Sequence, residues 1–183
     1  MTDFVDFGFP HAYECRALPE APPARILETF PANSRADTGD LLVVEVEPQH
    51  STRWLGGFVR EFQGCPDGLF GCPDPQSLVV VAGGLAYVVA ASDPTTARAL
   101  PVIPTMTAFG DPSLRVLFLA SFDKVFAFNA AMTPIWKSDL ESDGIEFVGV
   151  ADRILSVRGY MPASQDWAAR QIPFADDAAT SGE

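Results

Sequence analysis

The sequence predicts an all-β fold, an antiparallel meander made of about three hairpin-based repeats. A valine precedes a tryptophan by eleven residues at Val43 and again at Val125, and each interval reads as a strand, a polar turn and a return strand. Gly83-Gly84, a pair that favours a hairpin turn, interrupts the longest uncharged apolar run, 78–91. Short strands at even spacing, separated by turn residues, are typical of sandwiches, barrels and propellers.

The repeats begin at Leu78, Leu114 and Ile145, and each supplies about three strands. A strand pair precedes them. A closed propeller usually needs at least about four blades of four strands, so we expect an open curved sheet, a partial propeller or a barrel-like sheet. Edge strands at Leu41–Glu47 and Trp167–Phe174 are candidates for pairing with a second copy, which would make a homo-oligomer.

The composition divides the chain into three parts. Residues 1–38 are rich in proline, which disfavours long helices and central strands, so we expect an irregular N-terminal arm. The phenylalanines of the arm indicate that it packs on the main body. Residues 39–175 form the β-repeat domain, and the polar stretch 176–183 is expected to be a frayed C-terminal tail.

The charge balance limits the classes of partner. Twelve Lys and Arg against 24 Asp and Glu give a net charge of −12, and 48% of the residues are hydrophobic. Such a surface repels phosphate, so we expect neither nucleic acid nor an anionic membrane as a partner. The apolar run 78–91 is too short to span a bilayer. The first residues lack the basic and apolar regions of a secretory signal, so a cytoplasmic protein is expected.

The sequence contains no motif that specifies a reaction or a cofactor. Gly-x-Ser-x-Gly and a Gly-x-Gly-x-x-Gly phosphate loop are absent, and the two histidines, His11 and His50, have no short metal-ligand spacing. We therefore expect no cofactor and no metal. The pair Cys65 and Cys72 in one loop favours free thiols, with a disulfide or a structural zinc as the alternatives.

Two polar segments are the candidate binding surface, because loops on a rigid β scaffold often carry function. They are the loop Gln63–Gln76, which repeats Gly-Cys-Pro-Asp, and the turn Pro48–Thr52. The candidate residues in and beside them are Gln49, His50, Trp54, Cys65, Asp67, Phe70 and Cys72.

Two side-chain patterns have a structural and a functional interpretation. The tryptophans Trp54, Trp136 and Trp167 each stand near the start of a return strand, which favours core packing over a stacking platform for a ring-bearing ligand. Glu45 and Glu47 share one face of a strand. Such a carboxylate pair usually faces solvent, and acid–base chemistry or calcium binding is the alternative.

Several segments of the C-terminal half match a pattern that recurs in other proteins: Phe118–Asp123, Ile135–Ser138, Asp143–Ile145 and Ile172–Phe174. In that pattern a hairpin ends near a Trp-Lys-Ser triplet, an Asp-Gly-Ile turn follows, and a late strand ends in Pro-Phe. Over residues 75–182 the chain resembles a group of small uncharacterised bacterial proteins with propeller-blade-like hairpin repeats. The resemblance implies a fold of repeated β-hairpins. It does not imply any particular activity.

Three functions are consistent with these patterns. The preferred one is a non-catalytic binding or interaction module for an unknown protein or small molecule, because the sequence offers β faces, edges and loops but no catalytic constellation. The second is an acidic partner that neutralises or regulates a basic protein. The third is an enzyme that uses the loop of Cys65 and Cys72.

Overall fold

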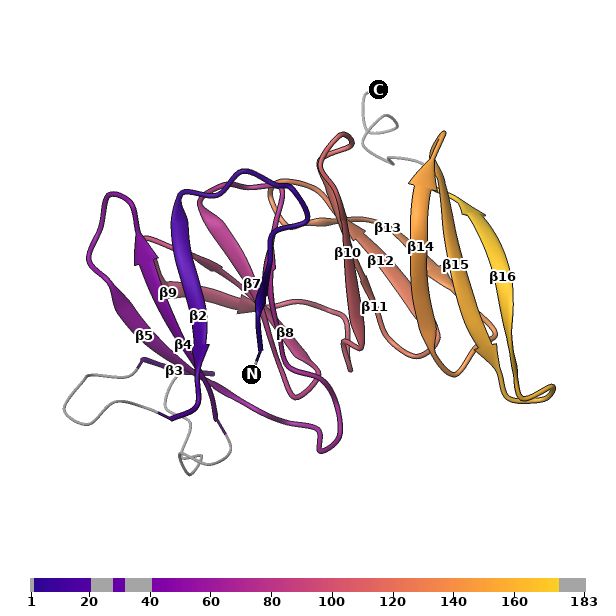
Figure 1. The fold of residues 1–183 in the computed structure, drawn as a ribbon, viewed down its shortest axis with the longest axis horizontal. Coiled ribbons are helices and arrows are strands. Elements are labelled where there is room, and N and C mark those ends of the chain that lie inside the picture. Colours follow the sequence, from indigo (N-terminus) through magenta and orange to yellow (C-terminus); the bar gives the residue numbers. More distant parts are fainter. Residues whose placement is uncertain (1, 21–27, 32–40, 175–183) are drawn as a thin grey trace, which may run out of the picture.

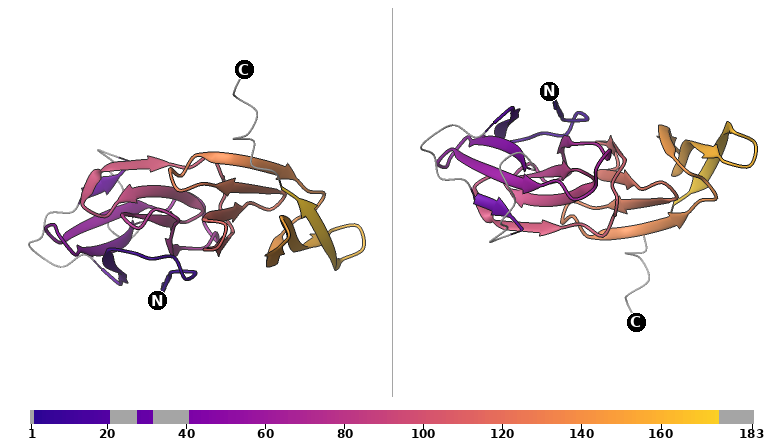
Figure 2. Two further views of the ribbon diagram at one scale, coloured as in Figure 1. Left: turned by 90° about the horizontal axis from the view of Figure 1, so that it is seen from above. Right: turned by 90° about the horizontal axis from the view of Figure 1, so that it is seen from below.

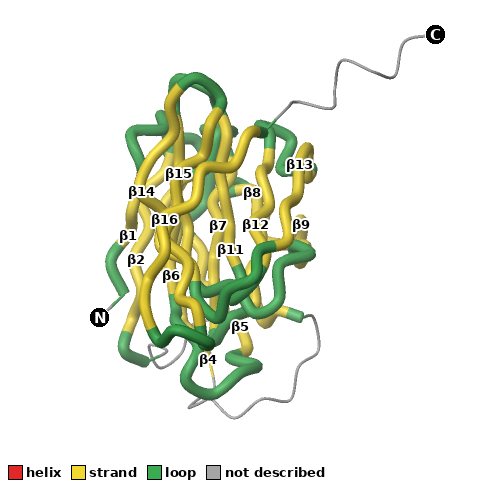
Figure 3. The backbone as a smooth tube through the Cα atoms, turned by 90° about the vertical axis from the view of Figure 1, so that its right-hand side faces the viewer, coloured by secondary structure: helices red, strands yellow, loops and turns green. Residues whose placement is uncertain are grey.

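The computed structural model describes residues 2–20, 28–31 and 41–174, and these contain strands and loops only (Figure 3). Within these residues, sixteen strands form four separate sheets, which follow one another along the long axis of the molecule (Figure 1). No helix in the described part of the chain has the length and hydropathy needed to cross a membrane. The all-β fold is confirmed, and the described sheets do not close into a barrel.

The first sheet combines N-terminal segments with the predicted strand pair, in the order β2-β4-β5-β3. Its strands are β2 (Tyr13–Leu18), β3 (Glu28–Phe30), β4 (Leu41–Pro48) and β5 (Trp54–Val59). β4 pairs antiparallel with both β2 and β5, whereas β3 pairs parallel with β5. The prediction that Leu41–Glu47 is an edge strand is therefore wrong, because β2 covers that edge.

The second sheet has five strands in the order β1-β6-β7-β8-β9. They are β1 (Phe4–Val5), β6 (Gly68–Gly71), β7 (Ser77–Ala82), β8 (Leu85–Ala90) and β9 (Asp93–Ala99). The hairpin of β7 and β8 turns at Gly83 and Gly84, as predicted. Both glycines have positive φ, 50° and 82°, which side chains disfavour.

The third and the last sheets are regular meanders of four and three strands. The third holds β10 (Thr107–Asp111), β11 (Val116–Ala120), β12 (Lys124–Phe128) and β13 (Pro134–Asp139). The last holds β14 (Ile145–Ala151), β15 (Ile154–Met161) and β16 (Asp166–Pro173). It lies at the opposite end of the molecule from the first sheet (Figures 1 and 2).

Each pair of successive sheets encloses one apolar layer. In β7, Leu78 and Val80 face the first sheet, while Val79 and Val81 face the third. In β11, Leu117 faces the second sheet, and its neighbours on the strand face the last. Strands buried on both faces have continuous apolar sequences, which explains why the run 78–91 shows no alternation. The last sheet buries one face, whereas the first sheet also buries residues of its other face, Leu41, Val43 and Leu55.

The predicted irregular arm is wrong over β1, β2 and β3. Prolines delimit the longest of these strands instead of interrupting it, because Pro10 and Pro19 lie outside Tyr13–Leu18. All three strands lie at sheet edges, where proline-flanked segments are tolerated. The arm does pack on the body, since Phe9 and Tyr13 are almost fully buried.

Two further strands lie where the sequence did not predict one. The predicted loop Gln63–Gln76 includes β6, and β10 lies just before Leu114, where the second repeat was expected to begin. Both strands are short, and each pairs with a strand that was predicted. The described chain therefore forms four successive sheets. The sequence had predicted three repeats preceded by a strand pair. The C-terminal tail expected over 176–183 lies outside the described residues.

Candidate functional site

The structure separates the predicted binding residues into two groups. The backbone N–H of Gln49 donates to Ala12 (3.0 Å), and that of Ala12 donates to Pro75 (2.9 Å), so the Pro48–Thr52 turn lies beside the end of the Gln63–Gln76 segment. Cys65 and Asp67 lie at the other end of β6 and β7, near Gly83 and Gly84. A strand of six residues spans about 17 Å. The two groups therefore do not form one site.

Several predicted site residues have structural contacts that explain them. Asp67 accepts hydrogen bonds from the Gly83 N–H (2.9 Å) and from Arg60 Nε (2.8 Å), and so holds the hairpin turn. Phe70 stacks on Phe7 with ring centroids 5.7 Å apart. The indole Nε1 of Trp54 donates to the carbonyl of Ala91 (2.7 Å). The exposed His50 and Gln49 remain available for binding.

The three cysteines are free thiols. Cys72 is 1% exposed, and its thiol donates to the carbonyl of Ser77 (3.1 Å). Burial raises the pKa of Cys72 to about 12, so the reactive thiolate is scarce at neutral pH. The geometry therefore gives no support to Cys72 as a nucleophile.

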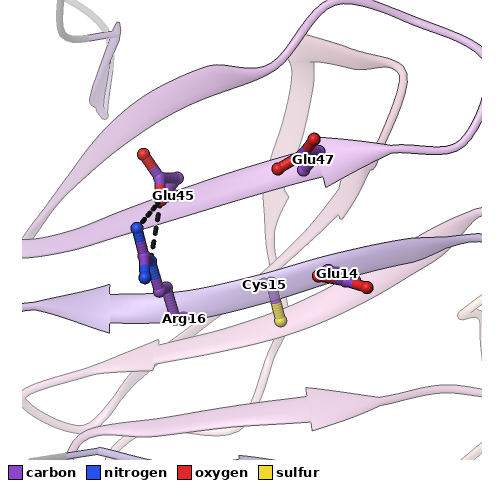
Figure 4. A pocket seen from close by; sticks show the side chains of 5 residues that line it. All are labelled: Glu14, Cys15, Arg16, Glu45 and Glu47. Carbon is purple, nitrogen blue, oxygen red and sulfur yellow. Dashed lines mark hydrogen bonds and ion pairs between the residues drawn. The ribbon is translucent and has the colours of Figure 1, made fainter.

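A polar trench crosses the outer face of the first sheet (Figure 4). Two adjoining hollows of about 170 and about 370 Å³ share Glu14 and Glu47. The residues that line this trench come from β2, β4 and their ends: His11, Tyr13, Glu14, Cys15, Arg16, Glu45, Glu47, Pro48 and Gln49. Of the predicted surface, only Gln49 lines the trench.

Strand register sets the charge pattern of the trench. β2 and β4 pair so that Arg16 lies opposite Glu45, and Glu14 lies opposite Glu47. Opposite charges on paired residues stabilise a sheet, whereas like charges directly opposite each other destabilise it. The trench therefore contains one favourable and one unfavourable cross-strand pair, side by side.

Glu45 is the buried member of the favourable pair. It is 5% exposed and accepts hydrogen bonds from Arg16 Nε (2.7 Å) and from Arg53 Nη2. Burial alone would raise the pKa of Glu45, but the hydrogen bonds and charges of Arg53 and Arg16 outweigh it and lower the pKa. Glu45 is thus an ionised structural carboxylate, which corrects the expectation that Glu45 and Glu47 both face solvent.

Glu14 and Glu47 form the unfavourable pair. Both are exposed, and neither makes a hydrogen bond or ion pair with another described residue. Arg53 is affected by the charge of Glu47 but is bound to Glu45. The trench therefore presents two adjacent carboxylates without a cationic partner in the described part of the chain.

The sequence did not reveal this site, because Glu14 and Arg16 belong to the segment expected to be irregular. The only signal was the placement of Glu45 and Glu47 on one face of a strand. Within residues 2–20, 28–31 and 41–174, no group of three or more His, Cys, Asp or Glu is arranged to hold a metal ion.

Comparison with known proteins gives a distant structural likeness. No family model and no curated protein sequence matches the chain. The chain is similar to the crystal structure of HIRA(644-1017), with a TM-score of 0.40 and 10% identity over 88% of this chain and 54% of that one. It is also similar to the N-terminal domain of Nup159, with a TM-score of 0.38 and 10% identity over 99% and 56%.

The chain spans about half the length of each of these two chains. The described residues form four sheets of β-hairpins, in keeping with the repeated hairpins that the resemblance in the sequence implied. At this level of likeness, the function has to be inferred from the residues of this chain.

Proposed function

We propose that the protein is a non-catalytic interaction module whose trench binds a basic segment of a partner protein. The observation that carries the proposal is the in-register opposition of Glu14 and Glu47, two exposed carboxylates that form no ion pair with another described residue. A lysine or arginine between them would turn a repulsive pair into an attractive site. The proposal thus assigns a specific surface to the hypothesis that this acidic protein binds a basic protein.

The energetics of the pair support a binding role. Like charges directly opposite each other on paired strands reduce stability by about 0.2–1 kcal/mol. Native proteins accept such a local loss of stability where function requires it. A cationic ligand would remove the repulsion, so binding should be coupled to a gain in stability.

The surroundings of the pair fit a peptide better than a compact ligand. The hollows are open and run along the strands from Arg16 to the His11 and Gln49 end. Gln49 and Glu14 offer hydrogen-bond acceptors, while the tyrosine hydroxyl of Tyr13 is bound to the carbonyl of Ser77 (2.8 Å). Extended chains with alternating side chains suit a surface built from adjacent β-strands.

The test compares binding and stability in the same variant. The probe is a fluorescent peptide of alternating lysine and alanine, titrated at about 0.05 M and about 0.3 M salt. In Glu14→Gln/Glu47→Gln we expect affinity to fall about tenfold at low salt and the free energy of unfolding to rise by about 0.5 kcal/mol. Opposite shifts in binding and stability are the signature of the proposal.

A matched control separates the site from net charge. Asp139→Asn/Glu141→Gln removes two exposed negative charges elsewhere on the chain, so the change in net charge is the same. We expect it to reduce peptide affinity less than threefold, since screening weakens distant charges. Equal losses in the two double variants, or no binding by the wild-type protein, would overturn the proposal.

A further inference from the structure

Among the described strands, none lies beside the outer edge of the last sheet. The other sheets contain four or five strands, and the last sheet contains three. β16 pairs with β15 over all eight of its residues without a bulge, and no described strand pairs with its other side. The unpaired edge of β16 is thus a long, regular row of backbone donors and acceptors, which invites another strand.

The outer edge strands of the second and third sheets have features that oppose such pairing. β9 contains Pro94 and a register shift, and the hydroxyl of Thr96 accepts the N–H of Ala90. β13 begins with Pro134 and also has a register shift. Prolines and bulges are common devices that block edge pairing. In β16 the only proline is its last residue.

The last sheet adds no net charge to the repulsion between two copies. The whole chain carries a net charge of −12. The segment 145–174 has equal numbers of acidic and basic residues, namely Glu146, Asp152, Asp166, Arg153, Arg158 and Arg170. A net-neutral edge on an acidic protein lowers the electrostatic repulsion that two copies meet there.

We propose that β16 pairs antiparallel with β16 of a second copy, about a two-fold axis that passes through Ala168. This register is self-complementary over Asp166–Arg170. Asp166 then lies opposite Arg170 of the second copy, and the symmetry repeats that pair. Trp167 lies opposite Ala169, and the two Ala168 residues meet at the centre, where small side chains leave room for the indoles.

Asp166 and Arg170 have no competing ion pair among the described residues. Asp166 Oδ1 accepts the backbone N–H of Trp167 (2.7 Å), and Arg170 Nη2 lies 3.9 Å from the sulfur of Met161. Both side chains are exposed. Cross-strand pairs of opposite charge stabilise antiparallel pairing, so the dimer uses two charges that form no ion pair within the described residues.

Charge selects this register over its neighbours. An axis through Arg170 would place two arginines opposite each other, which is unfavourable. An axis through Ala169 would place Asp166 opposite Ile172 and leave both charges unpaired. Only the register centred on Ala168 joins Asp166 to Arg170 twice.

The test is a charge reversal with rescue, read out by sedimentation equilibrium over a range of protein concentrations. Asp166→Arg places two arginines opposite each other, and Arg170→Asp places two carboxylates opposite each other. We expect each single variant to weaken the dimer at least about tenfold. The double variant restores the opposite-charge pair in reversed order and should return the dissociation constant to within about threefold of wild type.

The controls exchange the same charges on β13, another outer edge strand. Asp139→Arg and Lys137→Asp change the net charge as the test variants do, and both positions are exposed. We expect neither to change the dissociation constant of the dimer more than about threefold.

A wild-type chain that stays monomeric at millimolar concentration would overturn the proposal. A dimer that is insensitive to both single reversals, or a double variant that is not rescued, would overturn it as well. The result is independent of the trench, which lies at the other end of the molecule.

Discussion

The first and the last sheets lie at the two ends of the stack, but they accommodate ionised side chains differently. In the first sheet, the Glu45 side chain is 7% exposed and is held by Arg16 and Arg53. In the last sheet, Glu146 and Arg158 form a pair at 3.1 Å in which each side chain is about half exposed. The comparison indicates that an end sheet can bury a carboxylate when two arginines enclose it. An exposed pair needs no such enclosure.

The tryptophans show the same difference between the ends. Trp54 packs against the apolar layer between the first two sheets, and Trp136 packs in the layer between the third and the last. Trp167 belongs to none of the apolar layers of the described chain; it contacts Tyr160 with ring centroids 5.7 Å apart and lies under Arg158. Core packing, expected for all three from their sequence positions, therefore holds for the first two only.

The largest expected difference between the two ends is in the stability lost when one aromatic side chain is removed, Phe58 from the first sheet or Trp167 from the last. Phe58 in the first sheet is fully buried, and its ring lies 4.7 Å from that of Phe30. Phe58→Ala should reduce the free energy of unfolding by about 3–5 kcal/mol, because it leaves a cavity. Trp167→Ala should cost about 1 kcal/mol. Urea denaturation measures both, and Phe58→Leu gives a milder cavity if Phe58→Ala does not fold. Equal losses at the two positions would contradict the comparison.

A smaller difference is expected for the two glutamates. Glu45→Gln removes the charge from hydrogen bonds to two arginines and should reduce stability by about 2 kcal/mol. Glu146→Gln weakens an exposed pair and should change stability by less than about 0.5 kcal/mol. Both substitutions keep the side-chain size, so urea midpoints at neutral pH compare charge alone. A loss for Glu146→Gln as large as for Glu45→Gln would show that enclosure by arginines is unimportant.

The smallest expected effect is the pH dependence of the stability that Glu45 contributes to the first sheet. The folded protein holds the pKa of Glu45 below its ordinary value of 4.5. The contribution of Glu45 to stability is therefore complete above that value and disappears as the pH falls through the lower, folded pKa. The stability gap between wild type and Glu45→Gln should close in acid, which thermal unfolding at a series of pH values would measure. A gap that stays constant down to about pH 3 would contradict the ionised state of Glu45.

The hairpins were predictable because their causes are local. Gly83-Gly84 supplies the positive φ values of a two-residue turn, and the apolar residues on either side form β7 and β8. The three C-terminal strand regions that begin near Ile145 were found for the same reason. In contrast, β2 was missed because its sequence, Tyr-Glu-Cys-Arg-Ala-Leu, has few apolar residues and lies between prolines. It becomes a strand only because β4 provides a partner.

The trench could not be predicted for the same physical reason. It depends on the register of β2 against β4, a pairing between segments about thirty residues apart. A shift of one residue in that register would move every side chain to the other face. Nothing within either strand indicates whether Glu45 or Glu47 will be enclosed by arginines, since Arg16 and Arg53 come from the two neighbouring segments.

Local sequence signals were enough to predict an all-β chain and the place of most hairpin turns, because glycine pairs, polar corners and apolar periodicity act over a few residues. The completion of the sheets depends on long-range packing. The parallel additions of β1 to β6 and of β3 to β5, the burial of Glu45 and the open edge of β16 depend on which distant segments meet. Those choices follow from the sum of many weak contacts across the whole chain, and no single stretch of residues encodes them.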